Sequence, residues 1–431
     1  MRTICYASRG SEKRLIRFAE SVSRSDVISE RVRSIRERIR AEGMPAVLAL
    51  SEEVEGVKLT PATLRVRDAE LRTGLQALSS ERRRAIREAM RSVRAFHRKS
   101  LPRKWAMRNA HGARVGEVFY PLREVGIYIP GGRVPLVSTV VMTAVLARMA
   151  GVRRIAVCTP PDSSGAVNPV LLGAFALCGV SEVYKLGGAV AVSTLAYGAG
   201  SIAPVDKIFG PGGAYLNEAK RQVFGEVGVD LLAGPSEVMI IADASTPPAY
   251  VAADLLAQAE HDVRSRVVFT APDREYVGLV RAEIDRQLPE LRHQDSIRAV
   301  LREGSLAVLV SGLEEAAAVA NLLAPEHLEI LLPPSSASRA TKLITTAGAI
   351  FEGRETPTVL GDFASGPNHT LPTGRTARYL SGLRVADFFR RSSVVRYSRQ
   401  SLARAARMVE AFSEMEQLDA HGRSLTIRLR D

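Results

Sequence analysis

The feature that most constrains the fold is an alternation, from about residue 115 onward, of short β-branched runs with helix-like segments. Each run ends in glycine before the next segment begins, as in VGIYIPGG at 125–132 and KIFGPGG at 207–213. This alternation is typical of βα units, whose strands form a mainly parallel sheet. A second series begins at AGPSEVMIIAD, 233–243, and continues through RVVFTAP, SLAVLV and LITTAGAIF. The sequence therefore predicts an α/β fold built from two α/β units.

The two ends of the chain depart from this pattern. Residues 1 to about 105 read as helices with basic faces, and in the segment 25–43 the apolar residues approximate a helical stripe: Val27, Ile28, Val32, Ile35 and Ile39. From about residue 384 the sequence predicts one long helix and a short polar tail. Such a helix packs either on a partner subunit or on its own domain, and the pattern leaves both open.

Composition excludes several classes of protein. The chain has 431 residues, 46% of them hydrophobic, which is enough for two or three domains with sizeable cores. Three cysteines are too few for a disulfide framework, and no apolar run approaches the roughly 18 residues of a spanning helix or forms a secretory signal. We therefore expect a soluble, cytoplasmic protein without a membrane partner.

The net charge of +13 raises the question of nucleic-acid binding. Much of the excess lies in residues 81–105, where aromatic residues are sparse and no nucleic-acid-binding motif occurs. Basic solvated helices have this composition, so we expect no nucleic-acid function.

Three junctions, at 125–132, 183–188 and 207–213, lead from a strand through glycines into a helix. Such turns let backbone N–H groups at a helix start approach a phosphate without a Cβ in the way. None is a full GxGxxG followed by an acidic residue, so ordinary tight βα turns explain them equally well.

The stretch LLAQAEHD places Gln258 and His261 three residues apart on a predicted amphipathic helix. The HExxH motif of zinc proteases is absent, because the first histidine is missing and the spacing differs. An amide oxygen and an imidazole nitrogen on one face suit a divalent cation such as zinc or manganese. A helix with a solvated histidine is the simpler alternative.

The segment LLAPEHLEI places Glu326 beside His327 after a proline. An adjacent carboxylate and imidazole suit two successive proton transfers at one centre, because histidine titrates near neutral pH and burial raises glutamate toward it. A polar helix cap is the alternative.

Two further segments carry polar residues of interest. The glycine-rich loop GDFASGPNHTLPTG, 361–374, holds Asp362, Asn368 and His369, and loops of this composition usually carry binding groups. Glu416 and His421 follow the C-terminal helix. By contrast, we expect three other histidines to be surface residues: His97, His111 and His293.

Taken together, several of these blocks resemble the histidinol dehydrogenase family. The resemblance runs from about residue 25 to the end and is strongest in YIPGG, VDKIFGPGG, LLAGPSEV, AADLLAQAEHD, LAPEHLEI, GDFASGPNHTLPTG and the final AH. It implies an enzyme that oxidises L-histidinol to L-histidine in two successive NAD-dependent steps, through the aldehyde, at the end of histidine biosynthesis.

The resemblance also implies roles for particular residues. The ligands of one zinc ion would be Gln258, His261, Asp362 and His421. The substrate would contact these four and also Ser236, His327 and Glu416. The catalytic pair would be Glu326 and His327, in which His327 takes the alcohol proton and Glu326 activates the water that adds to the aldehyde. The C-terminal segment would reach the neighbouring subunit's site, so a homodimer is implied.

The cofactor side departs from the family pattern. Tyr128 matches one NAD contact, but Val190 stands where the family has glutamine, and Gly213 where it has asparagine. Each loss removes a hydrogen bond of about 0.5 to 1.5 kcal/mol, so together they would weaken NAD binding roughly 5- to 150-fold. A paralogue that oxidises another small alcohol, such as a sulfopropanediol, and a zinc-dependent binding protein that has lost the dinucleotide are therefore alternatives.

We accordingly predict two Rossmann-like α/β domains with a helical lead-in and a small C-terminal helical tail. Residues 1–25 would be an N-terminal arm. Residues 26–127 and 236–383 would form the first domain, with the metal and catalytic residues, and 128–235 the second, on the dinucleotide side. Residues 384–431 would form the tail.

Overall fold

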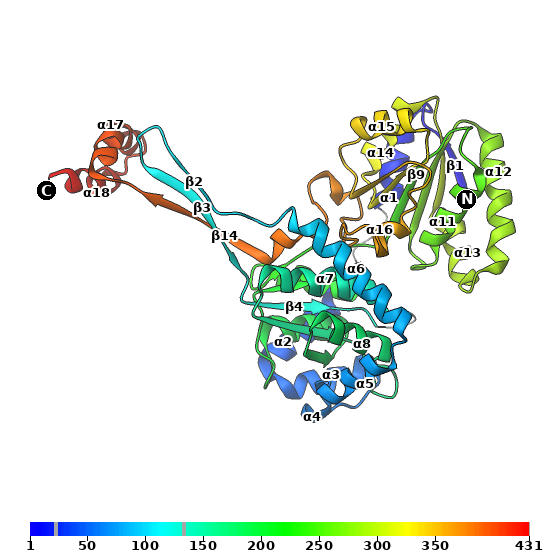
Figure 1. Ribbon diagram of the computed structural model, residues 1–431, viewed down its shortest axis with the longest axis horizontal. Helices are drawn as coiled ribbons and strands as arrows, with labels where there is room; N and C mark the ends of the chain where they lie inside the picture. Colours follow the sequence, from blue (N-terminus) through cyan, green and yellow to red (C-terminus); the bar gives the residue numbers. More distant parts are fainter. Residues whose placement is uncertain (21–24, 132–134, 431) are drawn as a thin grey trace.

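The computed structural model describes residues 1–20, 25–131 and 135–430, so Gly132 of the first glycine junction lies outside the described residues. Two α/β bodies lie side by side, and a long arm projects from them (Figure 1). Within the described ranges, no helix combines the length and the apolarity that crossing a membrane requires. The two α/β units predicted from the sequence are thus present, each with its own sheet.

The first body contains a six-stranded, wholly parallel sheet. In spatial order its strands are β1 (Arg2–Cys5), β11 (Ser305–Leu309), β10 (Arg266–Ala271), β9 (Glu237–Ile241), β12 (His327–Ile330) and β13 (Ala349–Glu352). Alternate residues of β9 face opposite cores, as the period of two requires: Val238 and Ile240 lie in one cluster, and Met239 and Ile241 in the other.

Helices cover both faces of this sheet. One core is closed by α11 (Pro248–Ala259), α12 (Arg274–Gln287), the 3₁₀ turn η1 (Leu288–Glu290) and α13 (Gln294–Glu303). The other core is closed by α1 (Ser11–Glu20), α14 (Leu313–Leu323) and α15 (Pro334–Leu343). The short helix α16 (Val359–Phe363) follows β13.

The second body contains a five-stranded parallel sheet. Its spatial order is β6 (Glu182–Lys185), β5 (Arg154–Thr159), β4 (Glu124–Tyr128), β7 (Lys207–Phe209) and β8 (Gly228–Val229). The chain order reverses between β4 and β7, and ligands of such sheets bind beyond the carboxyl ends of the two strands at that point.

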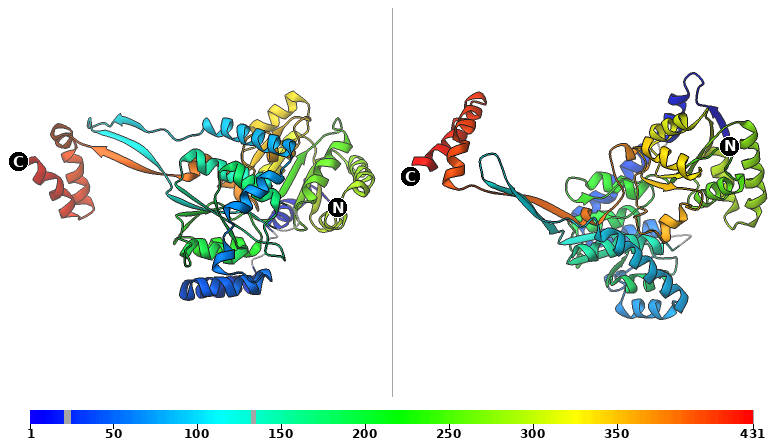
Figure 2. Two further views of the ribbon diagram at one scale, coloured as in Figure 1. Left: turned by 60° about the horizontal axis from the view of Figure 1, so that its bottom comes forward. Right: turned by 45° about the horizontal axis from the view of Figure 1, so that its top comes forward.

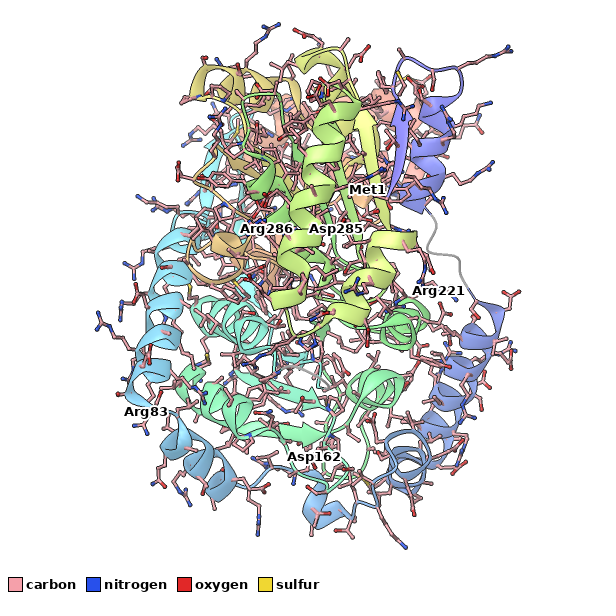
Figure 3. The ribbon with its side chains drawn as sticks, turned by 90° about the vertical axis from the view of Figure 1, so that its right-hand side faces the viewer. Met1, Arg83, Asp162, Arg221, Asp285 and Arg286 are labelled. Atoms are coloured by element: carbon pink, nitrogen blue, oxygen red, sulfur yellow. The ribbon has the colours of Figure 1, made fainter. Side chains whose placement is uncertain are left out.

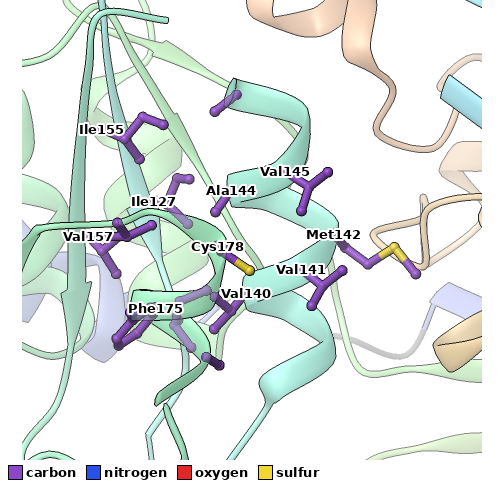
Figure 4. Packing of buried hydrophobic residues seen from close by; sticks show 14 of the residues in the cluster. Ile127, Val140, Val141, Met142, Ala144, Val145, Ile155, Val157, Phe175 and Cys178 are labelled. Carbon is purple, nitrogen blue, oxygen red and sulfur yellow. The ribbon is translucent and has the colours of Figure 1, made fainter. Parts of the chain in front are cut away.

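Two helical layers enclose this sheet. One consists of α5 (Asp68–Ala77), α6 (Ser80–Arg98), α7 (Val137–Ala150) and α8 (Pro169–Cys178), and Figure 4 shows Val140 of α7 beside Phe175 of α8 in its core. The other consists of α2 (Asp26–Glu42), α3 (Met44–Glu55), α4 (Pro61–Leu64), α9 (Gly188–Tyr197) and α10 (Ala214–Val223).

This arrangement corrects two predicted groupings. Helices α2 to α6 belong to the body of the five-stranded sheet, where they share its two cores, whereas residues 26–127 were expected to join residues 236–383. The buried stripe Val32, Ile35 and Ile39 of α2 lies in the core shared with α9 and α10, because that face offered the complementary apolar surface. Likewise, β1 is no free N-terminal arm, since it pairs in parallel with β11.

The arm is a third element that the sequence did not predict. It is a three-stranded antiparallel sheet of β2 (Trp105–Arg108), β3 (Arg114–Pro121) and β14 (Phe389–Arg396). Beyond the 3₁₀ turns η2 (Thr376–Arg378) and η3 (Val385–Phe388), the tail therefore begins with a strand. Two helices follow in place of the one predicted, α17 (Arg399–Met415) and α18 (Asp419–Arg430), and they lie well away from both bodies in every view (Figures 1 and 2).

Two predictions concerned the surface: that His97 lies on it, and that the basic residues are solvated there. Their outcomes differ. His97, expected at the surface, is buried in α6, and burial lowers its pKa to about 4. The basic residues are spread over the surfaces of both bodies, as Arg83 of α6 and Arg286 of α12 illustrate (Figure 3).

Candidate active site

A cavity of about 1570 Å³ lies between the two bodies. On the five-stranded side, the loops that follow β4 and β7 line it, with Pro130, Gly131 and Pro211 among their residues. These loops leave the two strands at which the chain order reverses, so the cavity lies where this sheet geometry places a ligand. On the six-stranded side, polar side chains from α11, β12 and α16 line the cavity.

Glu326 and His327 lie at the start of β12, and both are buried in the wall of the cavity. The carbonyl oxygen of Glu237 accepts a hydrogen bond from Nδ1 of His327 at 3.1 Å. Because a carbonyl only accepts, Nδ1 carries the proton, which leaves Nε2 as the acceptor. The backbone N–H of Glu237 donates to Oε2 of Glu326 at 2.8 Å. One residue of β9 therefore orients both side chains.

The electrostatics of this pair follow from burial. Burial raises the pKa of Glu326 well above its ordinary value. Burial also lowers the pKa of His327 to about 4. At neutral pH His327 is thus a neutral imidazole, and the contact of 3.5 Å between its Nδ1 and Oε2 of Glu326 joins two groups that both favour their neutral forms. A neutral imidazole and a carboxyl with a raised pKa can exchange protons with a ligand in the cavity.

Glu237 is a residue that the sequence analysis missed. Its side chain is buried, and burial raises its pKa to about 7, although its Oε1 accepts a hydrogen bond from the N–H of Gly374 at 3.0 Å. The only sequence signal was its place beside Ser236 in the block LLAGPSEV. Ser236 itself lines the cavity.

Gln258 and His261 both face the cavity, but not from one continuous helix. Helix α11 ends at Ala259, and His261 lies in the turn beyond, where its N–H donates to the carbonyl of Gln258 at 3.4 Å. The predicted common helix face is therefore wrong, although the spacing still brings both residues to the cavity. Gln258 is only 4% exposed, and among the described residues its Nε2 has no hydrogen-bond partner.

Asp362, in α16, lines the cavity beside His369. Nδ1 of His369 lies 3.5 Å from Oδ1 of Asp362, and its Nε2 lies 3.4 Å from Oγ1 of Thr139. Burial raises the pKa of Asp362, but hydrogen bonding to His369 and the charges of nearby imidazoles outweigh it, so the net shift is downward. Asp362 is therefore a carboxylate at neutral pH.

Glu416 and His421 do not meet these residues in one chain. Glu416 caps α17 and His421 lies in α18, at the far end of the arm (Figure 1). Neither is among the described residues that line the cavity. Consistent with this separation, the described part of the chain holds no cluster of three histidine, cysteine or acidic residues with metal-site geometry.

The three residues expected on the cofactor side occupy different positions. Gly213 lines the cavity and begins α10 without a side-chain cap, and a Cβ built on it would meet open space. Tyr128 and Val190 are buried and are not among the described lining residues. The hydroxyl of Tyr128 accepts a hydrogen bond from the N–H of Gly188 at 3.3 Å, and burial raises its pKa to about 12.

Comparison with known proteins identifies the family. The family model described as histidinol dehydrogenase matches residues 19–429 of the chain. The chain belongs to the histidinol dehydrogenase family. Members of this family are NAD-dependent oxidoreductases that act on an alcohol and then on its aldehyde in histidine biosynthesis.

Individual members of the histidinol dehydrogenase family align over almost the whole chain. The enzyme from Heliobacterium mobile is 42% identical over 402 residues, which are 93% of this chain and 94% of that protein. The enzyme from a Synechococcus strain is also 42% identical, over 94% of this chain and 93% of its own. The crystal structure of histidinol dehydrogenase from Elizabethkingia anophelis matches with a TM-score of 0.94 and 33% identity, over 100% of this chain and 98% of its own.

Proposed function

We propose that the protein oxidises L-histidinol to L-histidine in two successive NAD-dependent steps, with Glu326 and His327 as its catalytic residues. The observation that carries the proposal is the buried pair itself. Its imidazole has an Nε2 without a hydrogen-bond partner among the described residues, and its carboxyl has a raised pKa. Both border a cavity with strand-end loops of the five-stranded sheet on the opposite side. NAD, when bound, accepts a hydride in each step.

In the first step, Nε2 of His327 takes the hydroxyl proton of the alcohol while the carbon-bound hydrogen leaves as hydride. The neutral state of His327 supports this role, because only the neutral imidazole accepts a proton. The hydrogen bond from Nδ1 to the carbonyl of Glu237 fixes the tautomer and steadies the imidazolium that forms.

In the second step, Glu326 takes a proton from the water that adds to the aldehyde carbon. The hydrate then loses a second hydride and a proton to give the carboxylic acid, which loses a further proton to give the carboxylate. A carboxylate with a raised pKa is a stronger base than an ordinary one, so the shift at Glu326 favours proton transfer from water once its own proton has left.

We further propose a divalent zinc ion held by Gln258, His261, Asp362 and His421 of the partner subunit. The buried Gln258 amide, whose Nε2 has no hydrogen-bond partner in the described part of the chain, fits a cation because rotation of the amide presents Oε1 to the same space. Together with an imidazole and a carboxylate, it makes a mixed nitrogen and oxygen set of the kind that binds zinc. The ion would anchor the imidazole and amine of the substrate and so position its alcohol carbon. Ser236 and Glu416 would complete the substrate contacts.

The proposal includes a homodimer in which the arm of each subunit carries Glu416 and His421 to the partner's cavity. The projection of the arm away from its own bodies supports this, as do apolar side chains that lie exposed on it, among them Met107, Val395 and Phe412. The unpaired state of the three cysteines suits a reducing cytoplasm.

The proposed reaction is tested by supplying the zinc-loaded protein with L-histidinol and NAD and following NADH and histidine. We expect two NADH per histidine formed. Other amino alcohols and a sulfopropanediol serve as competing substrates. Preferred turnover of one of these, or saturable zinc binding without NADH formation, would refute the proposal in favour of a paralogue or a binding protein.

The shared site is tested by mixing two inactive variants, His261→Ala and His421→Ala. In a mixed dimer one cavity carries both substitutions and the other carries neither, so random 1:1 assembly should restore about a quarter of wild-type activity. His293→Ala, at the start of α13, is the control and should remain active. Two inactive parents that stay inactive after co-refolding would place both histidines in the same subunit's site.

A further inference from the structure

The loop Gly210–Gly213 follows β7, and its last three residues line the cavity on the cofactor side. Gly210 has a φ of 113°, and a Cβ there would lie 2.1 Å from the carbonyl oxygen of Tyr128, so the position accepts only glycine. Apart from Pro211, the loop has no side chain of its own. Other residues must therefore hold its backbone in place.

Two fully buried charged side chains hold Gly210 from beneath. The ammonium of Lys220, in α10, donates to the carbonyl of Gly210 at 2.8 Å, to that of Leu231 at 2.9 Å, and to Oδ1 of Asp230. Oδ2 of Asp230 accepts a hydrogen bond from the N–H of Gly210 at 2.8 Å. Each of the three ammonium protons thus has an acceptor, and both polar backbone groups of Gly210 are bound by this ion pair.

The same contacts fix a second cavity-lining segment. Residues 230–236 lead from β8 of one sheet to β9 of the other, and all of them line the cavity. In this crossing segment, residues 230–236, the carbonyl of Leu231 accepts a hydrogen bond from Lys220. The side-chain amide of Asn217, in α10, donates to the carbonyl of Gly212 at 2.9 Å and to that of Ala233. Helix α10 therefore ties the glycine loop to the crossing segment from behind.

We propose that the Lys220–Asp230 ion pair positions the backbone of the Gly210–Gly213 loop for dinucleotide binding. This rests on the proposed use of NAD. Gly213 offers no polar side chain, so the loop presents backbone groups, and their placement depends on the pair. Lys220 and Asp230 are positioning residues and take no part in proton or hydride transfer.

The test replaces the pair with neutral side chains of similar size, Lys220→Met together with Asp230→Leu. Substituting both avoids leaving one buried charge alone, which would endanger folding. The expected result is a rise of about tenfold or more in the KM for NAD, with kcat for L-histidinol oxidation within about threefold of wild type. Calorimetric titration with NAD should show a matching loss of affinity.

A matched control lies at the opposite edge of the same sheet. Arg154, at the start of β5, bonds Glu182 and Glu124 and the carbonyls of Ala203 and Pro204. The control variant Arg154→Met with Glu182→Leu removes a comparable network remote from the cavity. We expect it to lose thermal stability but to keep its KM for NAD.

The outcomes are distinguishable. An unchanged KM for NAD in the folded Lys220/Asp230 variant, or an equal rise in the control, would overturn the positioning role. A wild-type protein that binds NAD without oxidising L-histidinol would refute the proposed reaction alone, because titration of the variant with NAD still decides the role of the pair.

Discussion

The two walls of the cavity are built by different means. On the six-stranded side, polar side chains line the cavity: Glu326, His327, Gln258 and Asp362. Burial shifts the pKa values of two of them, Glu326 and His327. On the five-stranded side, glycine loops contribute backbone groups beside side chains of α6, α7 and α10, and Tyr128 and Val190 are buried outside the lining.

This difference predicts which positions of the cavity tolerate substitution. A proton transfer needs one particular side chain with a suitable pKa, and no backbone group replaces it. A dinucleotide can be held by many backbone contacts, so the absence of a polar side chain at Gly213 should cost a limited amount of affinity. Substitutions on the two walls should therefore differ in size and in the kinetic constant they change.

The largest effect should come from His327→Ala. Removing the base for the alcohol proton should lower kcat about 10²- to 10⁴-fold while the KM for NAD changes little. Steady-state NADH formation with L-histidinol measures both constants. A rise in the KM for NAD with kcat preserved would contradict the proposal that one wall carries proton transfer and the other binds NAD.

Glu326→Gln should have the next largest effect, and it should be uneven. Loss of the base for hydration should slow acid formation from the aldehyde about 10²-fold and aldehyde formation from the alcohol less. Single-turnover experiments that start from each substrate separate the two steps. Equal slowing of both steps would contradict the assignment of Glu326 to hydration.

Glu237→Gln should change how stability depends on pH. The pKa of Glu237 in the folded protein, about 7, lies above its ordinary value of 4.5. Its contribution to the free energy of unfolding is therefore fully present below pH 4.5 and lost as pH rises through 7. In the variant, the glutamine oxygen still accepts the hydrogen bond from Gly374, but the side chain cannot ionise. The variant should therefore lack the pH-dependent loss of at most about 3 kcal/mol in the free energy of unfolding. Urea unfolding of both proteins between pH 4.5 and 8 measures this, and parallel pH profiles would contradict the shift.

The smallest effect should come from Gly213→Asn, which introduces the residue that the family resemblance implies at this position. Gly213→Asn has open space for the side chain and adds a helix cap, so we expect NAD affinity to rise about 2- to 10-fold. Val190→Gln is the contrasting variant, because Val190 is 1% exposed and a buried amide there should destabilise the fold. Calorimetry with NAD that shows a gain far above tenfold for Gly213→Asn would contradict the backbone-based account of this wall, and no gain would contradict the expected contact of the new side chain.

Much of the candidate site could be predicted from short sequence blocks. Gln258, His261, Glu326, His327 and Asp362 all line the cavity, as expected for residues that close or follow strands and helices. The role of Glu237 could not be predicted from the sequence, because it orients Glu326 and His327 through its backbone N–H and carbonyl, which almost any residue type supplies. The clustering of Lys220 with Asp230 likewise left no motif, since it joins the end of a helix to a loop ten residues later.

The sequence by itself determined the α/β class, the two strand series and the polar residues at their ends, because these depend on local periodicity and turn chemistry. Only the tertiary structure decided which sheet each element joined. The apolar stripe of α2 would fit many surfaces, and it packs with α9 and α10 because these present the complementary face. The pairing of β14 with β3 joins residues more than 250 positions apart, a contact that no local pattern encodes. That pairing carries α18, the helix that contains His421, away from the two bodies.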